Sequence, residues 1–365
     1  MVIFANKIMV KTKIVIIYGG RSVEHGVSVN SARNIFRYID RALFEPIPIG
    51  ISQDGYWCKT KGIVKDICKG REVSLGLSPD NPFFIDEFGD KWEADIAFPV
   101  LHGTGGEDGS IQGLLKTAGF KVVGSDVQGS ALAMNKLIAK RLLQQAGIPV
   151  VPFRAHFFHE PPPAFSFLEK ELGTPFMVKA AGLGSSVGIS KVSDEEGYKK
   201  ALSDSFQYDD CVLFEKFVKA REIECAVMGN EKPEASCPGE IVINPAYDFY
   251  TFDAKYVSQD AVEIKVPAPL ASEVAEKIRA LSVKAYQALC CNDFARVDLF
   301  LTPDREVYVN EINSIPGFTD ASMFPMMWKE RGISFTDLLT QLINVALKRH
   351  EGEARISRSY ESSLK

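Results

Sequence analysis

Two stretches near the C-terminal end of the chain carry polar side chains whose types suit metal and phosphate chemistry. Residues 295–301 and 306–312 are rich in strand-forming residues and flank a proline-containing turn, so they predict a β-hairpin. Alternate residues of a strand share one face. The polar residues expected together on one face are Arg296 and Asp298, with Glu311 and Asn313. The hairpin therefore gathers a cation, two carboxylates and an amide.

Two interpretations of this polar face are open. Opposite charges on a hairpin are commonly a solvated surface with a cross-strand ion pair. Carboxylate and amide oxygens are also the ligands of a Mg2+ ion that keeps waters and bridges to phosphates. Residues 314–317 form a Pro-Gly turn, and Ser322 then lies beside a cluster of Met, Phe and Pro. Because no second polar surface follows, we favour a functional site.

The composition limits the class of protein. A chain of 365 residues with 46% hydrophobic and 24% charged residues has room for two or three domains with ample cores. A net charge of −5 without a basic cluster gives no support for nucleic-acid binding. No apolar run approaches the roughly 18 residues of a membrane helix, and no signal peptide is recognised. Seven cysteines without a CxxC pair suit a reducing compartment, so a cytoplasmic protein is expected.

The first third of the chain begins like a βαβ unit. Residues 13–18 are a near-continuous apolar strand, as in a parallel sheet buried on both faces. A Gly-Gly turn follows, and residues 28–39 have a helical pattern. Ligands of open α/β sheets bind at such carboxyl ends of strands. Glu24 lies in this turn, where it either binds a ligand or favours the N-terminus of the helix electrostatically.

A second buried strand leads into another glycine-rich loop. Residues 95–101 form this strand, and residues 102–109 (HGTGGEDG) contain four glycines, which allow a close backbone approach to a ligand or a tight turn. A helix over residues 110–118 and a strand over residues 121–123 complete the unit. We predict a doubly wound domain that ends near Gly124.

The middle of the chain offers two lysines. Residues 130–146 predict one helix, with Lys136 beside its apolar stripe, where a lysine more often extends its ammonium to solvent than binds a ligand. Residues 182–188 are a loop of three glycines and two serines between two short strands, with Lys179 just before it. Backbone amides, Ser185 and Ser186 could bind phosphate oxygens there, or the loop could be a simple glycine hairpin.

The next elements contain two glutamates, Glu215 and Glu222, and a long loop. Residues 211–217 and 222–228 are expected to be antiparallel strands, with glutamates placed either near a ribose or on an exposed edge. Residues 244–260 form a polar and aromatic loop of the length that lids have. Residues 272–289 predict an amphipathic helix that packs behind the hairpin.

Taken in order, these pieces resemble the ATP-grasp ligases and, among them, the D-alanine–D-alanine ligase family. The strings that carry the resemblance are GGRSVEHGVSVNS, LHGTGGEDGSIQGLL, MNKLIAKRLLQQAGIPV, GSSVGISKV, DAKY, RVDLF and NEINSIPGFTDASMFP, within residues 13–347. The resemblance implies an α/β fold, α+β in the C-terminal half, with a doubly wound parallel-sheet domain before the ATP-grasp domains. The implied domains are residues 1–125, 126–215 and 216–350, with a lid at 244–260 and a tail at 351–365.

The resemblance also implies a set of site residues. Contacts to ATP are implied for Lys136, Lys179, Ser185, Ser186, Glu215, Lys216, Val218, Glu222 and Lys255. Two Mg2+ or Mn2+ ions would be held by Asp298, Glu311 and Asn313. Substrate contacts are implied for Glu24, Arg296, Gly317, Ser322 and Met323. A hydrogen-bond set of Glu24, Ser185 and Tyr256 would link the first domain, the phosphate loop and the lid.

The implied reaction joins two D-alanine molecules through an acyl phosphate and releases ADP and phosphate, for peptidoglycan precursors. Its partners are the small molecules ATP and D-alanine, with no nucleic acid and no membrane. Family members are often dimers, so a homodimer is an expectation that no residue pattern here supports. Tyr256 favours D-alanine over D-lactate as the acceptor, while Met323, where leucine is frequent, leaves D-serine open. A non-catalytic regulator of the same fold would have lost the metal ligands or Arg296, and neither is lost.

Overall fold

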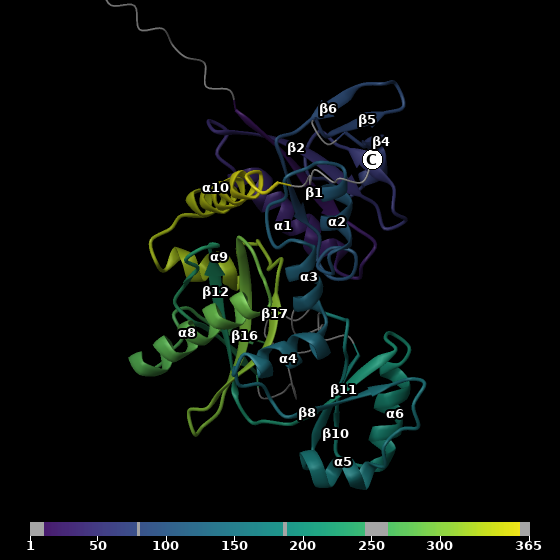
Figure 1. The fold of residues 1–365 in the computed structure, drawn as a ribbon, viewed down its shortest axis with the longest axis vertical. Helices are drawn as coiled ribbons and strands as arrows, with labels where there is room; N and C mark the ends of the chain where they lie inside the picture. Colours follow the sequence, from purple (N-terminus) through teal and green to yellow (C-terminus); the bar gives the residue numbers. More distant parts are fainter. Residues whose placement is uncertain (1–10, 79–80, 185–187, 245–261, 358–365) are drawn as a thin grey trace, which may run out of the picture.

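The computed structural model describes residues 11–78, 81–184, 188–244 and 262–357, arranged around three β-sheets (Figure 1). The first sheet has the strand order β6-β5-β4-β3-β2-β1-β7. Its strands are β1 (Thr12–Gly19), β2 (Phe44–Ile51), β3 (Trp57–Lys59), β4 (Arg71–Gly76), β5 (Phe83–Asp86), β6 (Lys91–Glu93) and β7 (Ile96–Val100). Strands β2, β1 and β7 are parallel, and β3 to β6 extend the sheet in antiparallel fashion.

The alternation along β1 explains why helices cover both faces of this sheet. Ile14 and Ile16 pack in the same core as Ile35 of α1 (His25–Tyr38), whereas Val15 and Ile17 pack with residues of α2 (Ser110–Thr117). A short 3-10 helix, η1 (Ile67–Lys69), lies between β3 and β4. The predicted doubly wound arrangement of this unit is confirmed, although the expected strand at 121–123 is reduced to a single bridge between Val122 and Ala97.

The single helix predicted over residues 130–146 is wrong, because two helices occupy this region. They are α3 (Val127–Met134) and α4 (Lys136–Gln145). Asn135 has an extended backbone, and its side chain accepts a hydrogen bond of 3.0 Å from the Ile138 amide as the N-cap of α4. The Lys136 amide donates to the Ala181 carbonyl at 2.8 Å instead of continuing the first helix. The break places Lys136 in the first turn of α4.

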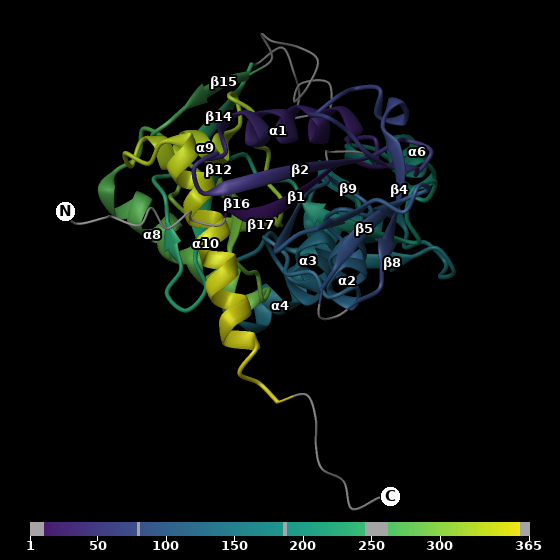
Figure 2. The ribbon, with the colours of Figure 1, turned by 90° about the horizontal axis from the view of Figure 1, so that it is seen from above.

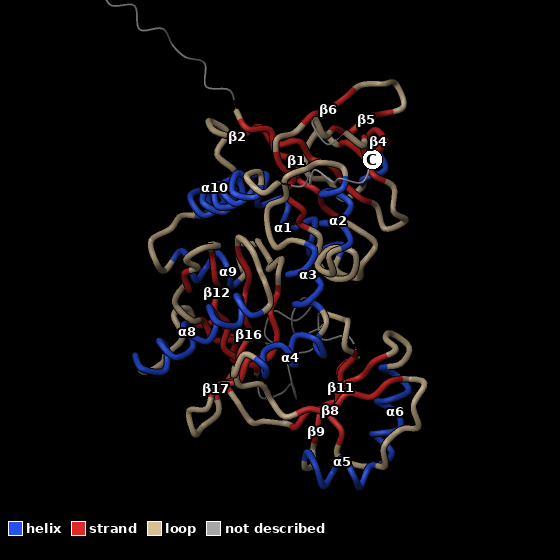
Figure 3. Tube along the Cα trace, viewed as in Figure 1, coloured by secondary structure: helices blue, strands red, loops and turns tan. Residues whose placement is uncertain are grey.

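The second sheet is antiparallel, with the strand order β10-β9-β11-β8. Its elements are β8 (Phe153–Phe157), α5 (Phe165–Leu172), β9 (Phe176–Ala180), β10 (Ile189–Val192), α6 (Glu195–Ser205) and β11 (Cys211–Lys216). Figure 3 shows this part of the chain with α5 and α6. Helices α5 and α6 cover one face through a core that contains Leu168, Phe176 and Phe214.

The third sheet has the order β15-β14-β12-β16-β17, with β13 paired to β12. Its strands are β12 (Arg221–Met228), β13 (Glu234–Ala235), β14 (Gly239–Ile243), β15 (Val262–Lys265), β16 (Phe294–Leu301) and β17 (Val307–Asn313). The predicted hairpin is confirmed as β16 and β17, and α8 (Ser272–Ala288) packs against both strands. The predicted antiparallel pairing of residues 211–217 with 222–228 is wrong, because β11 belongs to the second sheet and β12 to the third.

The end of the described chain returns to the first domain. After α9 (Met323–Lys329), helix α10 (Phe335–Glu353) contacts α1 and, in Figure 2, runs across the direction of α1 (Figures 1 and 2). The Arg349 side chain donates at 2.9 Å to the fully buried Asp293 carboxylate and at 2.8 Å to the Val122 carbonyl. This contact joins the first and third sheets. Within the described residues no helix is long and apolar enough to cross a bilayer.

Candidate active site

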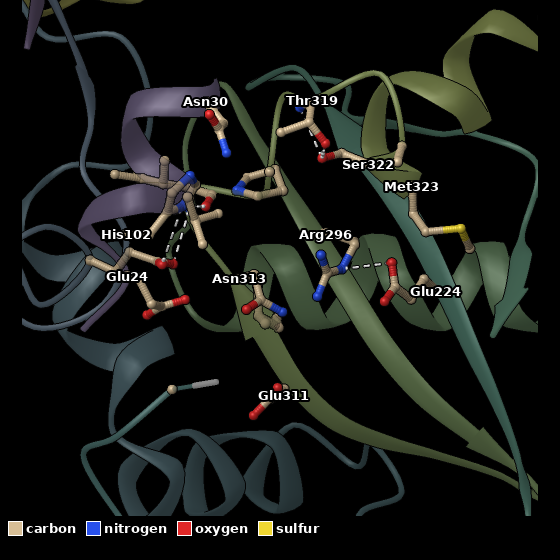
Figure 4. A pocket seen from close by; sticks show the side chains of 18 of the residues that line it. Glu24, Asn30, His102, Glu224, Arg296, Glu311, Asn313, Thr319, Ser322 and Met323 are labelled. Atoms are coloured by element: carbon tan, nitrogen blue, oxygen red, sulfur yellow. Dashed lines mark hydrogen bonds and ion pairs between the residues drawn. The ribbon is translucent and has the colours of Figure 1, made fainter. Parts of the chain in front are cut away.

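The hairpin of β16 and β17 presents its polar face to a cavity of about 590 Å3 between the first and third sheets. In the strand register Arg296 is opposite Asn313, and Asp298 is opposite Glu311. Figure 4 shows Arg296, Asn313 and Glu311 on the sheet, with Glu24 and His102 facing them from the first domain. The hairpin residues predicted from alternate spacing do come together.

Arg296 is held by two carboxylates. It donates from Nε to Oδ1 and from Nη2 to Oδ2 of Asp298, both at 2.7 Å, and its Nε lies 2.9 Å from Oε2 of Glu224. Asn313 donates from Nδ2 to Oδ2 of Asp298 at 2.9 Å. Glu224 was not predicted. Its place two residues after Glu222 on the same face of β12 is the signal that could have identified it.

A second cavity of about 230 Å3 lies between the second and third sheets and meets the first. Among the predicted nucleotide residues it is lined by Lys179, Glu215, Lys216, Val218 and Glu222. Glu224 and Glu311 line both cavities, Asp298 lines the second, and Asn313 lines the first. The predicted metal ligands therefore stand where the two cavities join.

The lysines of this region are paired with carboxylates. Lys136 Nζ donates to the Leu183 carbonyl and lies 3.3 Å from Oε2 of Glu311. Lys179 Nζ lies 2.7 Å from Oε2 of Glu215 and donates to Oδ1 of Asn310 at 3.3 Å. Burial alone would raise the pKa of Glu215, but Lys140 and Lys179 lower it to about 2.

Both cavities carry more acidic than basic side chains. Among the described residues, each is lined by five aspartates or glutamates and three lysines or arginines. Burial, and after it the Glu24 carboxylate, raises the pKa of Glu107 to about 8. Glu107 accepts hydrogen bonds from the Gly103 amide at 3.1 Å and the Ile315 amide at 3.3 Å. An anionic ligand would therefore need cations to accompany it.

His102 is buried, and its partners define its tautomer. Nδ1 lies 2.9 Å from the Ile315 carbonyl, which can only accept, so Nδ1 carries the proton. Nε2 then accepts from the Ser31 hydroxyl at 3.0 Å, and Ser31 Oγ accepts from the Phe318 amide at 3.2 Å. Burial lowers the pKa of His102, so this neutral form is retained. His102, Glu107 and Ser31 were not predicted, although the glycine-rich loop that begins with His102 was noted.

The remaining predicted residues lie at the first cavity or outside the described chain. Glu24, Gly317, Ser322 and Met323 line the cavity. A Cβ atom at Gly317 would lie 2.6 Å from Ser322 Oγ, so a larger residue there would displace the Ser322 hydroxyl. The predicted residues Ser185, Ser186, Lys255 and Tyr256 lie outside the described residues, as does most of the expected lid. In the described part of the chain no three His, Cys, Asp or Glu side chains gather as a metal site, so the candidate set is two carboxylates and an amide.

Comparisons with known proteins define the class. A family model for the D-ala D-ala ligase N-terminus matches residues 13–125, and one for the C-terminus matches residues 142–344. The D-alanine–D-alanine ligase A of Escherichia coli K12 is 43% identical over 363 residues, covering 94% of this chain and 98% of that protein.

Solved structures of ligases share the fold of this chain. The D-alanine-D-alanine ligase from Coxiella burnetii has a TM-score of 0.84 at 34% identity, covering 94% of this chain and 96% of its own. The VanG D-Ala:D-Ser ligase from Enterococcus faecalis has a TM-score of 0.84 at 34% identity, covering 92% and 100%. The fold is therefore the ATP-grasp fold of carboxylate–amine ligases. Within that class, the chain belongs to the D-alanine–D-alanine ligase family, and its use of ATP follows from this membership.

Proposed function

We propose that this chain joins two D-alanine molecules into D-alanyl-D-alanine with ATP, for peptidoglycan precursors. The single observation that carries the proposal is the junction of the two cavities at the hairpin. The cavity beside Lys179 fits the nucleotide, the cavity beside Glu24 fits the amino acids, and the carboxylates of the hairpin lie between them. A phosphoryl group could therefore pass from one cavity to the other without leaving the protein.

The residues present fit two Mg2+ or Mn2+ ions. Asp298 and Glu311 are opposite each other in the strand register, and Asn313, two residues after Glu311 on β17, supplies an amide. Mg2+ keeps several waters and takes its remaining ligands from substrate phosphates, so few protein oxygens suffice. When bound, such ions neutralise the charge on the transferring phosphoryl group. The acidic excess of both cavities supports this assignment.

The proposed reaction has two displacements. An oxygen of the first D-alanine carboxylate attacks the γ-phosphorus of ATP, and ADP leaves. The amine of the second D-alanine then attacks the acyl carbon, phosphate leaves with the original carboxylate oxygen, and the nitrogen gives up a proton to phosphate or water. Arg296 and the Gly317 amide would stabilise the oxyanion, since preorganised donors act most strongly in a buried site.

The same cavity offers contacts for both amino acids. Glu24 would bind the ammonium group of the first D-alanine, and Ser322 the carboxylate of the second, with Met323 beside it. Exclusion of water would protect the acyl phosphate from hydrolysis. We assign that task to the predicted lid with Tyr256 and Lys255, and to its hydrogen-bond set with Ser185.

The setting of the reaction belongs to the proposal. All seven cysteines are free thiols, which supports a reducing compartment such as the cytoplasm. We also propose that the chain forms a homodimer, as expected from the family, and the mass measured by analytical sedimentation would test this. The domain limits near residues 125, 215 and 350 are proposed on the same basis.

ADP release tests the activity. The chain is incubated with ATP and Mg2+ plus D-alanine, L-alanine, or D-alanine with D-serine or D-lactate, and the products are weighed by mass spectrometry. D-alanine-dependent ADP release with the dipeptide as product supports the proposal. If D-alanyl-D-serine is the main product, the acceptor is D-serine, as in the VanG D-Ala:D-Ser ligase, and not D-alanine. No release in any mixture would refute the activity.

A further inference from the structure

A buried cluster of two lysines and one glutamate lies behind the wall of the second cavity. Lys140 Nζ is 3.2 Å from Oε1 of Glu215, and Lys179 Nζ is 2.7 Å from Oε2 of the same carboxylate. Lys140 and Glu215 are each only 1% exposed. Glu215 and Lys179 line the cavity, but Lys140 does not. One carboxylate is therefore shared by a lysine that faces the cavity and a lysine that does not.

The fold explains how Lys140 reaches this point. Helix α4 lies between the second and third sheets: Leu137 packs with Leu213 of β11, while Ala139 and Leu143 pack in the core of the third sheet. Lys140, on the next turn, extends to Glu215 near the end of β11 and lies 5.8 Å from the Phe153 ring. Its ammonium is thus enclosed among protein groups and cannot reach a ligand in the cavity.

The charges of the cluster set a condition on ligand binding. Lys179 directs two of its three N–H donors to Glu215 and Asn310, so a bound phosphate competes with the Glu215 carboxylate for the charge of Lys179. A buried carboxylate that loses its counter-ion is strongly destabilised. Lys140 lies 3.2 Å from the same carboxylate through a separate contact, so Glu215 retains this partner when Lys179 turns to a phosphate. Burial lowers the pKa of Lys140, and the Glu215 carboxylate counters that shift.

We propose that Lys140 is a positioning residue that serves as the permanent counter-ion of Glu215 and thereby allows Lys179 to bind nucleotide phosphates. This inference rests on the proposed function, in which Lys179 contacts the phosphates of ATP. Without the charge of Lys140, Glu215 would depend on Lys179 as its counter-ion. The interaction of Lys179 with the nucleotide phosphates would then be weaker. The effect would therefore depend on the phosphates of the ligand and not on its base.

Nucleotide titrations test this inference. The dissociation constants of Mg-ATP and of adenosine, which lacks phosphates, are measured by calorimetry for the unchanged chain and for Lys140→Met, with Lys170→Met at an exposed position of α5 as the matched control. We expect Lys140→Met to weaken Mg-ATP binding by about tenfold and to leave adenosine binding within about twofold. Equal weakening of both ligands, or of neither, would overturn the proposal.

Two further variants separate a charge effect from simple damage. Lys140→Arg keeps the charge and should retain most of the Mg-ATP affinity. In Glu215→Gln the carboxylate charge is absent, so adding Lys140→Met should cost no further Mg-ATP affinity. A double variant that loses the full tenfold relative to Glu215→Gln would overturn the proposal. If Lys140→Met does not fold, Lys140→Arg and the double variant still decide the question.

The failure of this inference can be told from the failure of the proposed function. If Lys179→Met binds Mg-ATP as tightly as the unchanged chain, the phosphate role of Lys179 is wrong, and the role of Lys140 is wrong with it. If Lys179→Met weakens Mg-ATP binding while Lys140→Met does not, only the role of Lys140 is refuted.

Discussion

Arg296 and Asp298, two residues apart on β16, form a two-pronged pair in which Nε and Nη2 each donate to a different carboxylate oxygen at 2.7 Å. Because the same Nε also lies 2.9 Å from Glu224, the guanidinium is fixed in its plane from two strands. Such fixation suits a group that must stabilise charge without reorganising during the reaction. It also couples the proposed oxyanion site to a proposed metal ligand.

Replacing Arg296 with lysine tests this coupling. An ammonium cannot reproduce the planar, two-pronged contact, so we expect kcat to fall by about 100-fold, with smaller changes in the KM for ATP. Steady-state ADP release with D-alanine gives both constants. Arg305→Lys, at the turn of the same hairpin, should change neither. Near-normal kcat in Arg296→Lys would argue against the oxyanion role.

Asn313→Ala tests the metal assignment. Loss of the amide removes one proposed ligand and the 2.9 Å hydrogen bond to Asp298. We expect kcat to fall by about 100-fold, or about 2.7 kcal/mol of transition-state stabilisation, and half-maximal activity to require more Mg2+. Thermal unfolding checks that the variant is folded, and Asn81→Ala at the surface is the control. Full activity with an unchanged Mg2+ dependence would refute the assignment.

Ser31→Ala tests how the first domain holds the turn that contains Gly317. The buried Ser31 hydroxyl connects Nε2 of His102 with the Phe318 amide, so its removal leaves both without that partner. We expect a loss of about 1–3 kcal/mol in the free energy of unfolding, measured by chemical denaturation. Ser74→Ala, at an exposed position of β4, should change it by less than about 0.5 kcal/mol. Equal stability of the two variants would mean that this contact does not hold the turn.

Glu107 should make stability depend on pH in a direction opposite to that of most carboxylates. Burial and the Glu24 carboxylate raise its pKa from 4.5 to about 8 in the folded chain. The folded state therefore binds the extra proton, and this contribution is complete below about pH 4.5 and lost as the pH rises through about 8. Chemical denaturation gives the free energy of unfolding of the unchanged chain and of Glu107→Gln at each pH. Between about pH 4.5 and 8 the value for the unchanged chain should fall relative to the value for Glu107→Gln. A constant difference would mean that the pKa of Glu107 is not raised.

Much of the fold followed from local patterns. Alternation predicted β16 and the face shared by Arg296 and Asp298. In β17 a register shift lets Val309 pack in the core while Glu311, two residues later, lines the cavity, and a strict period of two does not predict this. The continuous apolar run of β1 predicted a strand covered on both faces. Asn135 carried a usable signal as well, since asparagine favours the N-cap over a helix interior, but the unbroken apolar stripe concealed it.

The tertiary structure alone decided which strands pair and which distant residues meet. The sequences of β11 and β12 suit a sheet equally well, and only the packing of α5 and α6 on one side and of α8 on the other assigns them to different sheets. Local patterns describe one strand or helix at a time.

Contacts across long separations in the chain depend on how those elements are assembled. Ser31 with Phe318, Lys140 with Glu215 and Glu224 with Arg296 are of this kind. The sequence by itself determined the residue types and the faces of the site. Assembly determined the partners, because burial of apolar faces, together with buried contacts such as Arg349 with Asp293, brings the sheets together.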